Sequence, residues 1–262
     1  MQTPFLDARQ ADSERLPRQS DNVPAESLAA VCHDLRTPLA AIKEALALLT
    51  ETASARLDER QRRYLAVARE EVERLNRMIT DLLDLSRMDS GKVALNCDAV
   101  DLPDLLAAAI ESLSPLASER DLVVERNIPP SLPPVPGDRD RLFRVVSNIL
   151  DNAIKNSPTG GKIRVNTALL DPGSSVLARK GIRADAGCIE LTVSDDGPGI
   201  PADALERIFD KYERVDSSGP GTGLGLAIVR SIVEMHHGKV WAESTPCHGA
   251  SFHVILPLRG NS

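Results

Sequence analysis

Two long stretches near the N-terminus place apolar residues at every third or fourth position. The first, from Ala25 to about Thr52, has the spacing of an amphipathic helix. After a short turn at residues 53–57, the second keeps a heptad seam of Leu65, Ala68, Val72, Leu75, Ile79 and Leu82. Met78 and Leu85 form a second apolar stripe beside that seam. Two stripes on one helix need more partners than a hairpin supplies, so we expect a homodimer in which two hairpins join as a four-helix bundle.

Beyond Gly91 the pattern changes to shorter elements of both kinds. Helical spacing predicts helices at about 102–118, 138–156 and 224–237. Apolar or alternating runs predict strands at 122–128, 162–170 and 188–195, and a closing hairpin of 239–245 with 250–258. Residues 129–137 form a proline-rich link, and residues 171–187 are expected to form a loop. Strands and helices that do not alternate strictly favour an α+β fold, with a mixed sheet covered by helices on one face.

The composition fits a folded protein of two domains. Of its 262 residues 42% are hydrophobic, enough for a sizeable core. Residues 1–24 are polar and interrupted by prolines, so we expect a flexible tail there. The four cysteines, at positions 32, 97, 188 and 247, are spaced neither as metal ligands nor as a redox pair, and we interpret them as packing residues.

Charge and hydropathy exclude several classes of function. The net charge is −7 and aromatic residues make up 3% of the chain, which argues against a basic or base-stacking surface for nucleic acid. The sequence has no apolar run near the roughly 18 residues of a membrane span and no signal-peptide pattern. We therefore expect a cytoplasmic protein.

The first helix contains a histidine followed by an acid. With about 100° of rotation per residue, His33 falls nearly opposite the apolar stripe, and Thr37 lies one turn further along the same face. A neutral imidazole in water is a nucleophile, and the adjacent Asp34 can accept its proton or fix its tautomer. The alternative is that Thr37 caps a helix beginning at Pro38 and that His33 is a solvated loop residue. Apolar periodicity that continues in phase through Pro38 favours one helix.

A polar stripe of Asn148, Asn152 and Lys155 follows the flank of the helix predicted at 138–156. Asparagine is a poor helix former, so two at this spacing need some compensation. An amide oxygen can help to hold Mg²⁺, and a lysine can meet phosphate charge. The alternative is a solvated polar flank.

Two glycine-containing segments complete the candidate chemistry. Asp195, Gly197 and Gly199 follow a predicted strand, where a carboxylate can accept a hydrogen bond from an exocyclic amine and glycines allow a tight turn. A plain turn is the alternative. Residues 219–226, GPGTGLGL, open a helix whose free amides suit a phosphate chain. A strand does not immediately precede this segment and a Walker lysine is absent, so another nucleotide-binding geometry is needed.

In chain order, five motifs resemble the H, N, G1, F and G2 boxes of bacterial two-component sensor histidine kinases. They are HDLRTPL at 33–39, the Asn148 and Asn152 pair, Asp195-x-Gly197-x-Gly199, IFDKY at 208–212, and Gly221-x-Gly223-x-Gly225. The resemblance covers about residues 25–258. It implies a dimerisation and histidine-phosphotransfer hairpin at 25–92, followed by a GHKL-type ATP-binding domain at 97–258.

The resemblance also implies a reaction. The γ-phosphoryl group of ATP would pass to Nε2 of His33, assisted by Asp34 as base, and then to an aspartate of a response regulator receiver domain. Thr37 would orient a water that dephosphorylates the regulator. Asn148 and Asn152 would hold Mg²⁺ and phosphate, with Lys155 nearby, and Asp195 would bind the adenine amine. The remaining pocket residues would be Gly197, Gly199, Gly221, Thr222, Gly223, Leu224 and Gly225.

Two other functions remain open. One is a phosphatase or docking scaffold that lacks kinase activity, against which the intact nucleotide motifs argue. The other is a GHKL ATPase of another kind, against which the exposed His33 on a dimerising hairpin argues. The 24 polar residues at the N-terminus are too few for a sensor domain, so we expect the stimulus to come from an upstream partner or from a longer receptor.

Overall fold

The computed structural model describes residues 25–53, 57–91, 93–182, 185–215, 222–245 and 247–258. Within these ranges, the side chains of residues 25–30, 33 and 53 are not described. The predicted tail at 1–24 lies outside the described residues, as does Gly221.

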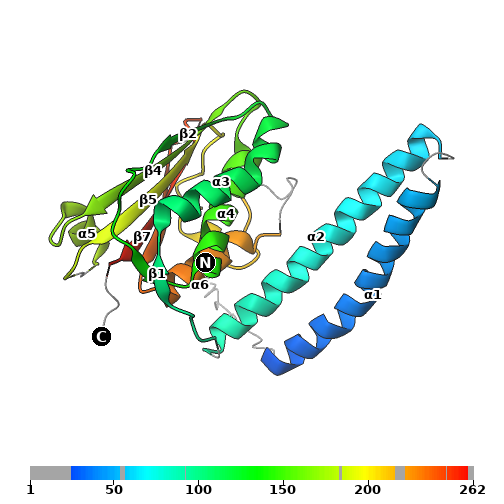
Figure 1. Cartoon of the computed structure of the whole chain (residues 1–262), viewed down its shortest axis with the longest axis horizontal. Coiled ribbons are helices and arrows are strands. Elements are labelled where there is room, and N and C mark those ends of the chain that lie inside the picture. Colours follow the sequence, from blue (N-terminus) through cyan, green and yellow to red (C-terminus); the bar gives the residue numbers. More distant parts are fainter. Residues whose placement is uncertain are drawn as a thin grey trace, which may run out of the picture.

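The N-terminal part is a hairpin of two long antiparallel helices, α1 (Ala25–Ala53) and α2 (Glu59–Asp89), shown in blue and cyan in Figure 1. α1 runs without a break through Pro38, so the alternative in which Thr37 caps a new helix is wrong. Asp58 begins α2 through a capping box, in which its side chain accepts from the backbone N–H of Gln61 at 2.7 Å. The hairpin was therefore correctly predicted from its periodicity.

The two helices meet along a narrow apolar seam. Its buried members are Cys32, Leu39, Val72, Ile79 and Leu83. Other apolar side chains on the hairpin stay at the surface, including Leu35 and Ile42 of α1 and Leu75 of α2. The predicted heptad seam of α2 is thus divided between a side that faces α1 and a side that remains exposed.

The rest of the chain is an α/β part built on a mixed sheet. The sheet strands are β2 (Val123–Asn127), β4 (Lys162–Leu170), β5 (Cys188–Asp195), β6 (Lys239–Ser244) and β7 (Ala250–Pro257). In the described part of the chain they form a five-stranded sheet in the order β2-β4-β5-β7-β6, with β2 parallel to β4 and the other pairs antiparallel. β1 (Asp98–Val100) pairs separately with β3 (Val135–Gly137), which lies inside the stretch predicted as a proline-rich link.

Three helices pack on one face of this sheet: α3 (Leu102–Ser118), α4 (Arg139–Asn156) and α6 (Gly225–Met235) (Figure 1). Asp101 caps α3 and Asp138 caps α4, each accepting a backbone N–H three residues ahead. Ile149 and Ala153 of α4 are completely buried in the main core, which also contains Leu191 and Val193 of β5. The α+β arrangement is as predicted.

Two further predictions were wrong. The expected loop at 171–187 contains a short helix, α5 (Ser175–Lys180), whose Leu177 packs with Cys188 and Ile255 in a separate small cluster. The cysteines do not all pack, because Cys32 and Cys188 are buried whereas Cys97 and Cys247 are exposed.

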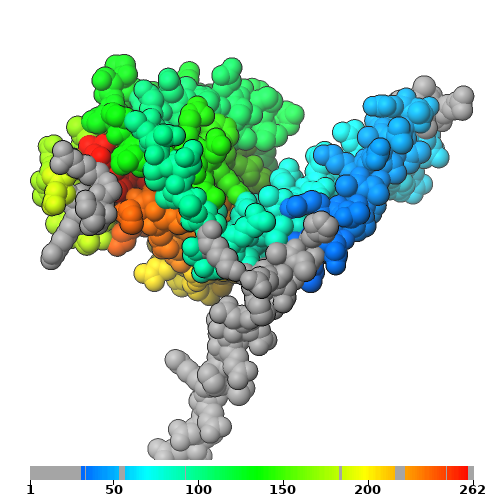
Figure 2. All heavy atoms as spheres, turned by 60° about the horizontal axis from the view of Figure 1, so that its bottom comes forward, coloured from blue at the N-terminus to red at the C-terminus, as the bar shows by residue number. Residues whose placement is uncertain are grey.

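The C-terminal end of α2 joins the core of the α/β part. Leu85 is 1% exposed and Met88 is 8% exposed, and both belong to the main core together with residues of α3, α4 and α6. The second apolar stripe of α2 therefore packs within the same chain, and not against a second chain as predicted. The turn end of the hairpin projects away from the α/β part (Figures 1 and 2).

Candidate nucleotide-binding site

Asp195 is the last residue of β5 and is only 5% exposed. One carboxylate oxygen, Oδ1, accepts the backbone N–H of Gly197 at 2.8 Å and that of Ala250 at 3.3 Å. Burial raises the pKa of Asp195, and the two backbone donors partly oppose that shift. The backbone thus fixes one side of a buried carboxyl group whose other oxygen can meet a donor on a ligand.

Close packing around Asp195 requires glycine at two places. A Cβ on Gly197 would lie 2.6 Å from Oδ1 of Asp195 and 2.9 Å from the carbonyl oxygen of Asn156. Gly249 has φ +77°, and a Cβ there would lie 1.8 Å from the carbonyl oxygen of Asp195. The sequence analysis missed Gly249, because nothing in a single sequence shows that the β6–β7 loop folds back onto the end of β5.

The β6–β7 loop also holds the turn after Asp195. The hydroxyl of Ser244 accepts the backbone N–H of Ile200 at 2.8 Å and donates to the carbonyl of Gly249 at 2.6 Å. The backbone N–H of Cys247 donates to the carbonyl of Pro198 at 2.7 Å. Ser244 is a second residue that the sequence analysis missed, and it acts by positioning the turn.

The asparagines of α4 lie beside the start of α6. The amide nitrogen of Asn148 donates to the carbonyl of Gly225 at 3.3 Å, which leaves its Oδ1 as an acceptor. Oδ1 of Asn152 accepts from the side chain of Asn156 at 3.1 Å. Lys155 is exposed and forms an ion pair with Asp151 one turn earlier. Asn148, Asn152 and Lys155 therefore all lie on α4 as predicted, and Asn148 forms a hydrogen bond with the glycine-rich segment.

The first turn of α6 offers backbone N–H groups. Its N-cap is Leu224, which is completely buried and makes no side-chain cap, so the first amides of the helix are left for a ligand. Oγ1 of Thr222 accepts the N–H of Leu224 at 3.2 Å and shapes the turn before the helix. Gly223 has φ +71°, and a Cβ there would lie 2.9 Å from the backbone of Tyr212. The N–H of Tyr212 donates to the carbonyl of Gly223 at 2.9 Å, which joins the F and G2 motifs.

The α/β part thus brings together Asp195, the turn at 197–199, the asparagines of α4 and the start of α6. The comparisons with known proteins agree with this arrangement. Residues 25–91 match the family described as His Kinase A (phospho-acceptor) domain, and residues 137–260 match the Histidine kinase-, DNA gyrase B-, and HSP90-like ATPase family. The mycobacterial sensor histidine kinase MprB is 32% identical, and the match covers 63% of this chain and 99% of that one with a TM-score of 0.51.

The chain belongs to the sensor histidine kinases.

Other members of the family match both parts of the chain. The adaptive-response sensory kinase SasA of Synechococcus sp. (strain JA-3-3Ab) is 36% identical over 234 residues, which are 88% of this chain and 58% of SasA. ShkA, solved at full length in complex with AMPPNP, is 29% identical with a TM-score of 0.73 and is matched over 92% of this chain and 47% of its own. The chain therefore spans about half the length of these longer kinases.

The residues of the predicted H box lie on a different element from the nucleotide site. His33, Asp34 and Thr37 belong to α1, and α2 lies between α1 and the α/β part (Figure 1). Asp34 and Thr37 are exposed, while the side chain of His33 lies outside the described part of the structure. The fold therefore does not bring the H box next to the other family motifs.

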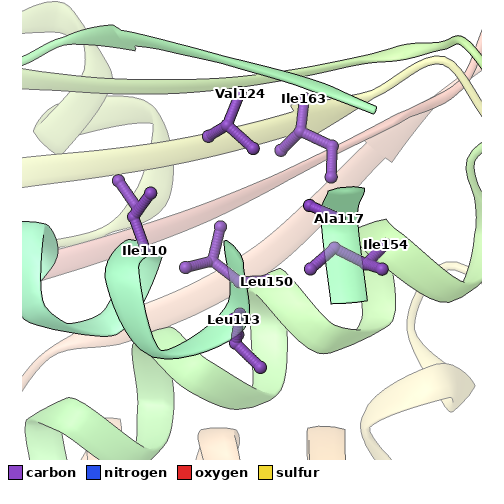
Figure 3. Close-up of a pocket in the computed structure, with 7 residues that line it drawn as sticks. All are labelled: Ile110, Leu113, Ala117, Val124, Leu150, Ile154 and Ile163. Carbon is purple, nitrogen blue, oxygen red and sulfur yellow. The ribbon is translucent and has the colours of Figure 1, made fainter. Parts of the chain in front are cut away.

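A cavity of about 10 Å³ lies between α3, α4 and the sheet, lined by apolar side chains such as Ile110, Leu150 and Ile163 (Figure 3). It is lined by none of the site residues and is a small packing gap.

Among the described residues, no helix has the length and hydropathy needed to cross a membrane.

Proposed function

We propose that this chain is an ATP-dependent protein-histidine kinase of a two-component system. Residues 25–92 serve as its dimerisation and phosphotransfer hairpin, and residues 97–258 bind ATP. The phosphoryl group then passes from His33 to an aspartate of a response regulator receiver domain, and Thr37 orients the water that later removes it.

The environment of the Asp195 carboxylate gives the most direct support for ATP binding. Its Oδ1 is occupied by two backbone donors, so Oδ2 is available to accept the exocyclic amine of adenine. The start of α6 and Asn148 lie together in the same part of the fold, where the phosphate chain requires donors. Gly221, Gly223 and Gly225 then line the phosphate chain, with Thr222 and Leu224 between them.

Mg²⁺ fits the donors present. Within the described residues, no group of three or more His, Cys, Asp or Glu side chains could hold a metal ion. Oδ1 of Asn148 and Oδ1 of Asn152 are hard oxygen ligands of the kind Mg²⁺ accepts when phosphate and water supply the remainder. The ion would neutralise phosphate charge, and Lys155 would add a cation at the end of the same stripe.

The chemical step is a transfer from oxygen to nitrogen. The lone pair of Nε2 of His33 attacks the γ-phosphorus, the bond from that phosphorus to the β,γ-bridging oxygen breaks, and ADP leaves with the electron pair. Asp34 accepts a proton from the imidazole, which keeps the nitrogen nucleophilic.

Dimerisation has its own support. Leu35 and Ile42 are one heptad apart on α1 and are each 47% exposed, and Leu75 of α2 is 43% exposed. Because a second hairpin could cover these side chains, we assign them to the dimer interface of a four-helix bundle.

The test is incubation with ATP labelled at the γ-phosphate. We expect an acid-labile, base-stable label on the wild-type protein and none on His33→Gln, while His33→Gln binds ATP within about threefold of wild type because His33 and the pocket lie on different elements. Asn152→Ala should lose Mg-ATP binding and label but remain dimeric. Retention of the label by His33→Gln would refute the assignment of the phosphoacceptor.

The same assay separates the two rival functions. ATP turnover without a label on the protein would indicate a GHKL ATPase of another kind. ATP binding with neither turnover nor label, together with dephosphorylation of a phosphorylated receiver domain, would indicate a phosphatase or docking scaffold.

A further inference from the structure

Arg230, in the middle of α6, contacts the segment that contains the F motif. Its guanidinium group donates to a carboxylate oxygen of Asp210 at 2.8 Å and to the backbone carbonyl of Glu206 at 3.1 Å. The same group lies over the ring of Phe209, 5.2 Å from its centre, within the range of a cation–π contact. One arginine of α6 therefore contacts residues 206–210 at three points.

These contacts orient the segment more than they hold it in the fold. Phe209 is 3% exposed and packs edge-on against Phe252 of β7, with the ring centres 6.4 Å apart, so apolar contacts already anchor the segment. The side chains of Arg230 and Asp210 are 34% and 55% exposed, and an ion pair as exposed as this one contributes little to stability. The guanidinium group instead adds geometry, because its planar set of N–H groups binds a carboxylate and a carbonyl in fixed directions.

The orientation of this segment reaches the turn that precedes α6. Two residues beyond Asp210, the backbone N–H of Tyr212 donates to the carbonyl of Gly223 at 2.9 Å. The packing there is tight, since a Cβ on Gly223 would lie 2.9 Å from the backbone of Tyr212. Gly223 directly precedes Leu224, the N-cap of α6. A displacement of Tyr212 therefore moves the turn that sets the direction of the first N–H groups of the helix.

The contacts form a closed path on α6. The path leads from Arg230 through Asp210 and Tyr212 to Gly223, and it returns along the helix itself. Arg230 is five residues, or about 7.5 Å, beyond the first residue of α6. The F motif is thus fixed at two points to the helix whose first turn offers donors for phosphate.

We propose that Arg230 is a positioning residue for the phosphate end of the nucleotide site, which acts through Asp210 and the F motif on the turn before α6. The adenine end is built separately, because Asp195 is held by the backbone N–H groups of Gly197 and Ala250. Arg230 therefore affects the binding of the phosphate chain and not that of the base. The proposal rests on the proposed function, since it requires ATP to bind with its phosphates at the start of α6.

The test compares the affinities of the full chain for Mg-ATP and for adenosine, which lacks the phosphates. Displacement of a fluorescent ATP analogue measures both. In Arg230→Gln the affinity for Mg-ATP should fall about three- to tenfold, because an exposed ion pair and a hydrogen bond are lost. The affinity for adenosine should stay within about twofold of the wild type, since the base binds at a separate place. In autophosphorylation, the KM for ATP should rise by the same factor as the loss of affinity, while kcat changes by less than about twofold.

Three further variants make the test specific. Arg230→Lys keeps a positive charge beside Asp210 but cannot bind both acceptors as the guanidinium group does, so its loss of affinity should be smaller. Asp210→Asn should also weaken Mg-ATP binding, and its combination with Arg230→Gln should bind no more weakly than Arg230→Gln alone, because the two residues act as one unit. Arg207→Gln is the matched control. Arg207 lies in the same segment and its side chain donates to Asp203, so both affinities should equal those of the wild type.

Equal losses of affinity for Mg-ATP and adenosine in Arg230→Gln would overturn the proposal, because they would indicate a general structural role. An unchanged affinity for Mg-ATP would overturn it as well. The melting temperature of Arg230→Gln should stay close to that of the wild type, since Phe209 remains in the main core. Failure of the proposed function is distinguishable, because the wild-type protein itself would then not bind Mg-ATP.

Discussion

Replacement of Asp195 by asparagine tests the adenine contact without removing the side chain. Asparagine retains an oxygen for the N–H groups of Gly197 and Ala250, so the loop should keep its conformation. The position of the second oxygen is then taken by an NH₂ group, which cannot accept the adenine amine. Loss of a hydrogen bond to a charged group is worth about 1.5–3 kcal/mol. We therefore expect the affinity for ATP to fall about 10- to 150-fold.

The same variant should change the preference between nucleotides. Adenine presents an amine donor at the position where guanine presents a carbonyl acceptor. The new NH₂ group can donate to guanine, so the ratio of the ATP and GTP affinities should narrow or invert. Titration calorimetry with both nucleotides measures this ratio directly. Asp196→Asn is the matched control, because Asp196 pairs with Arg164 at 3.0 Å and takes no part in the proposed pocket.

Stability provides an internal check on the variant. Burial raises the pKa of Asp195, so ionisation of this carboxyl opposes folding at pH values above its folded pKa. A neutral asparagine avoids this penalty, and the melting temperature at pH 7 should be equal to or above that of the wild type. ATP affinity within twofold of the wild type, in a variant with unchanged stability, would refute the assignment of Asp195 to adenine.

Three other predictions concern the dimer, Thr37 and pH. Leu75→Asp places a charge in the proposed dimer interface, so the free energy of dimerisation should weaken by several kcal/mol and the protein should become monomeric. Light scattering measures this change, and an unchanged dimer would exclude the interface. Thr37→Ala should keep autophosphorylation and transfer to the regulator but slow dephosphorylation of the regulator about tenfold or more. A parallel loss of these rates with a lower melting temperature would indicate a structural role instead. Burial lowers the pKa of His236, whose ring accepts the N–H of Asp138 at 2.9 Å, so stability should fall as pH drops below about 6.5, where the unfolded chain binds the proton more readily. Melting temperatures between about pH 5 and 7.5 should show a weaker pH dependence for His236→Gln than for the wild type.

Local signals in the sequence predicted most of the fold. α3 and α4 have strong periodicity and aspartate caps, so their limits were close to the observed ones. β1 and β3 each have three residues, and their pairing joins segments that are far apart in the chain, which leaves little local signal. α5 has six residues and is stabilised by contacts with Cys188 and Ile255 that exist only after the sheet has formed.

The sequence predicted which residue types make up the candidate site, but only part of their arrangement in space. The position of Asp195 at the end of a strand was correct because strand periodicity ends there. The contacts of Gly249 and Ser244 with that strand end depend on the tertiary fold, and a single sequence does not show them. The prediction that Leu85 packs against a second chain was wrong for the same reason, since an apolar stripe does not identify which element covers it.

The hydrogen bond from Tyr212 to Gly223 closes the chain between them at its base. Once the two ends are fixed, the free energy needed to close an intervening loop grows only slowly, by roughly 0.6 kcal/mol for each doubling of its length. Insertions or exchanges between residues 216 and 220 should therefore be tolerated without displacing Asp195 or Asn148. Evolution, or a protein engineer, can consequently vary the length of the chain between these two residues while the framework proposed to position the base remains the same.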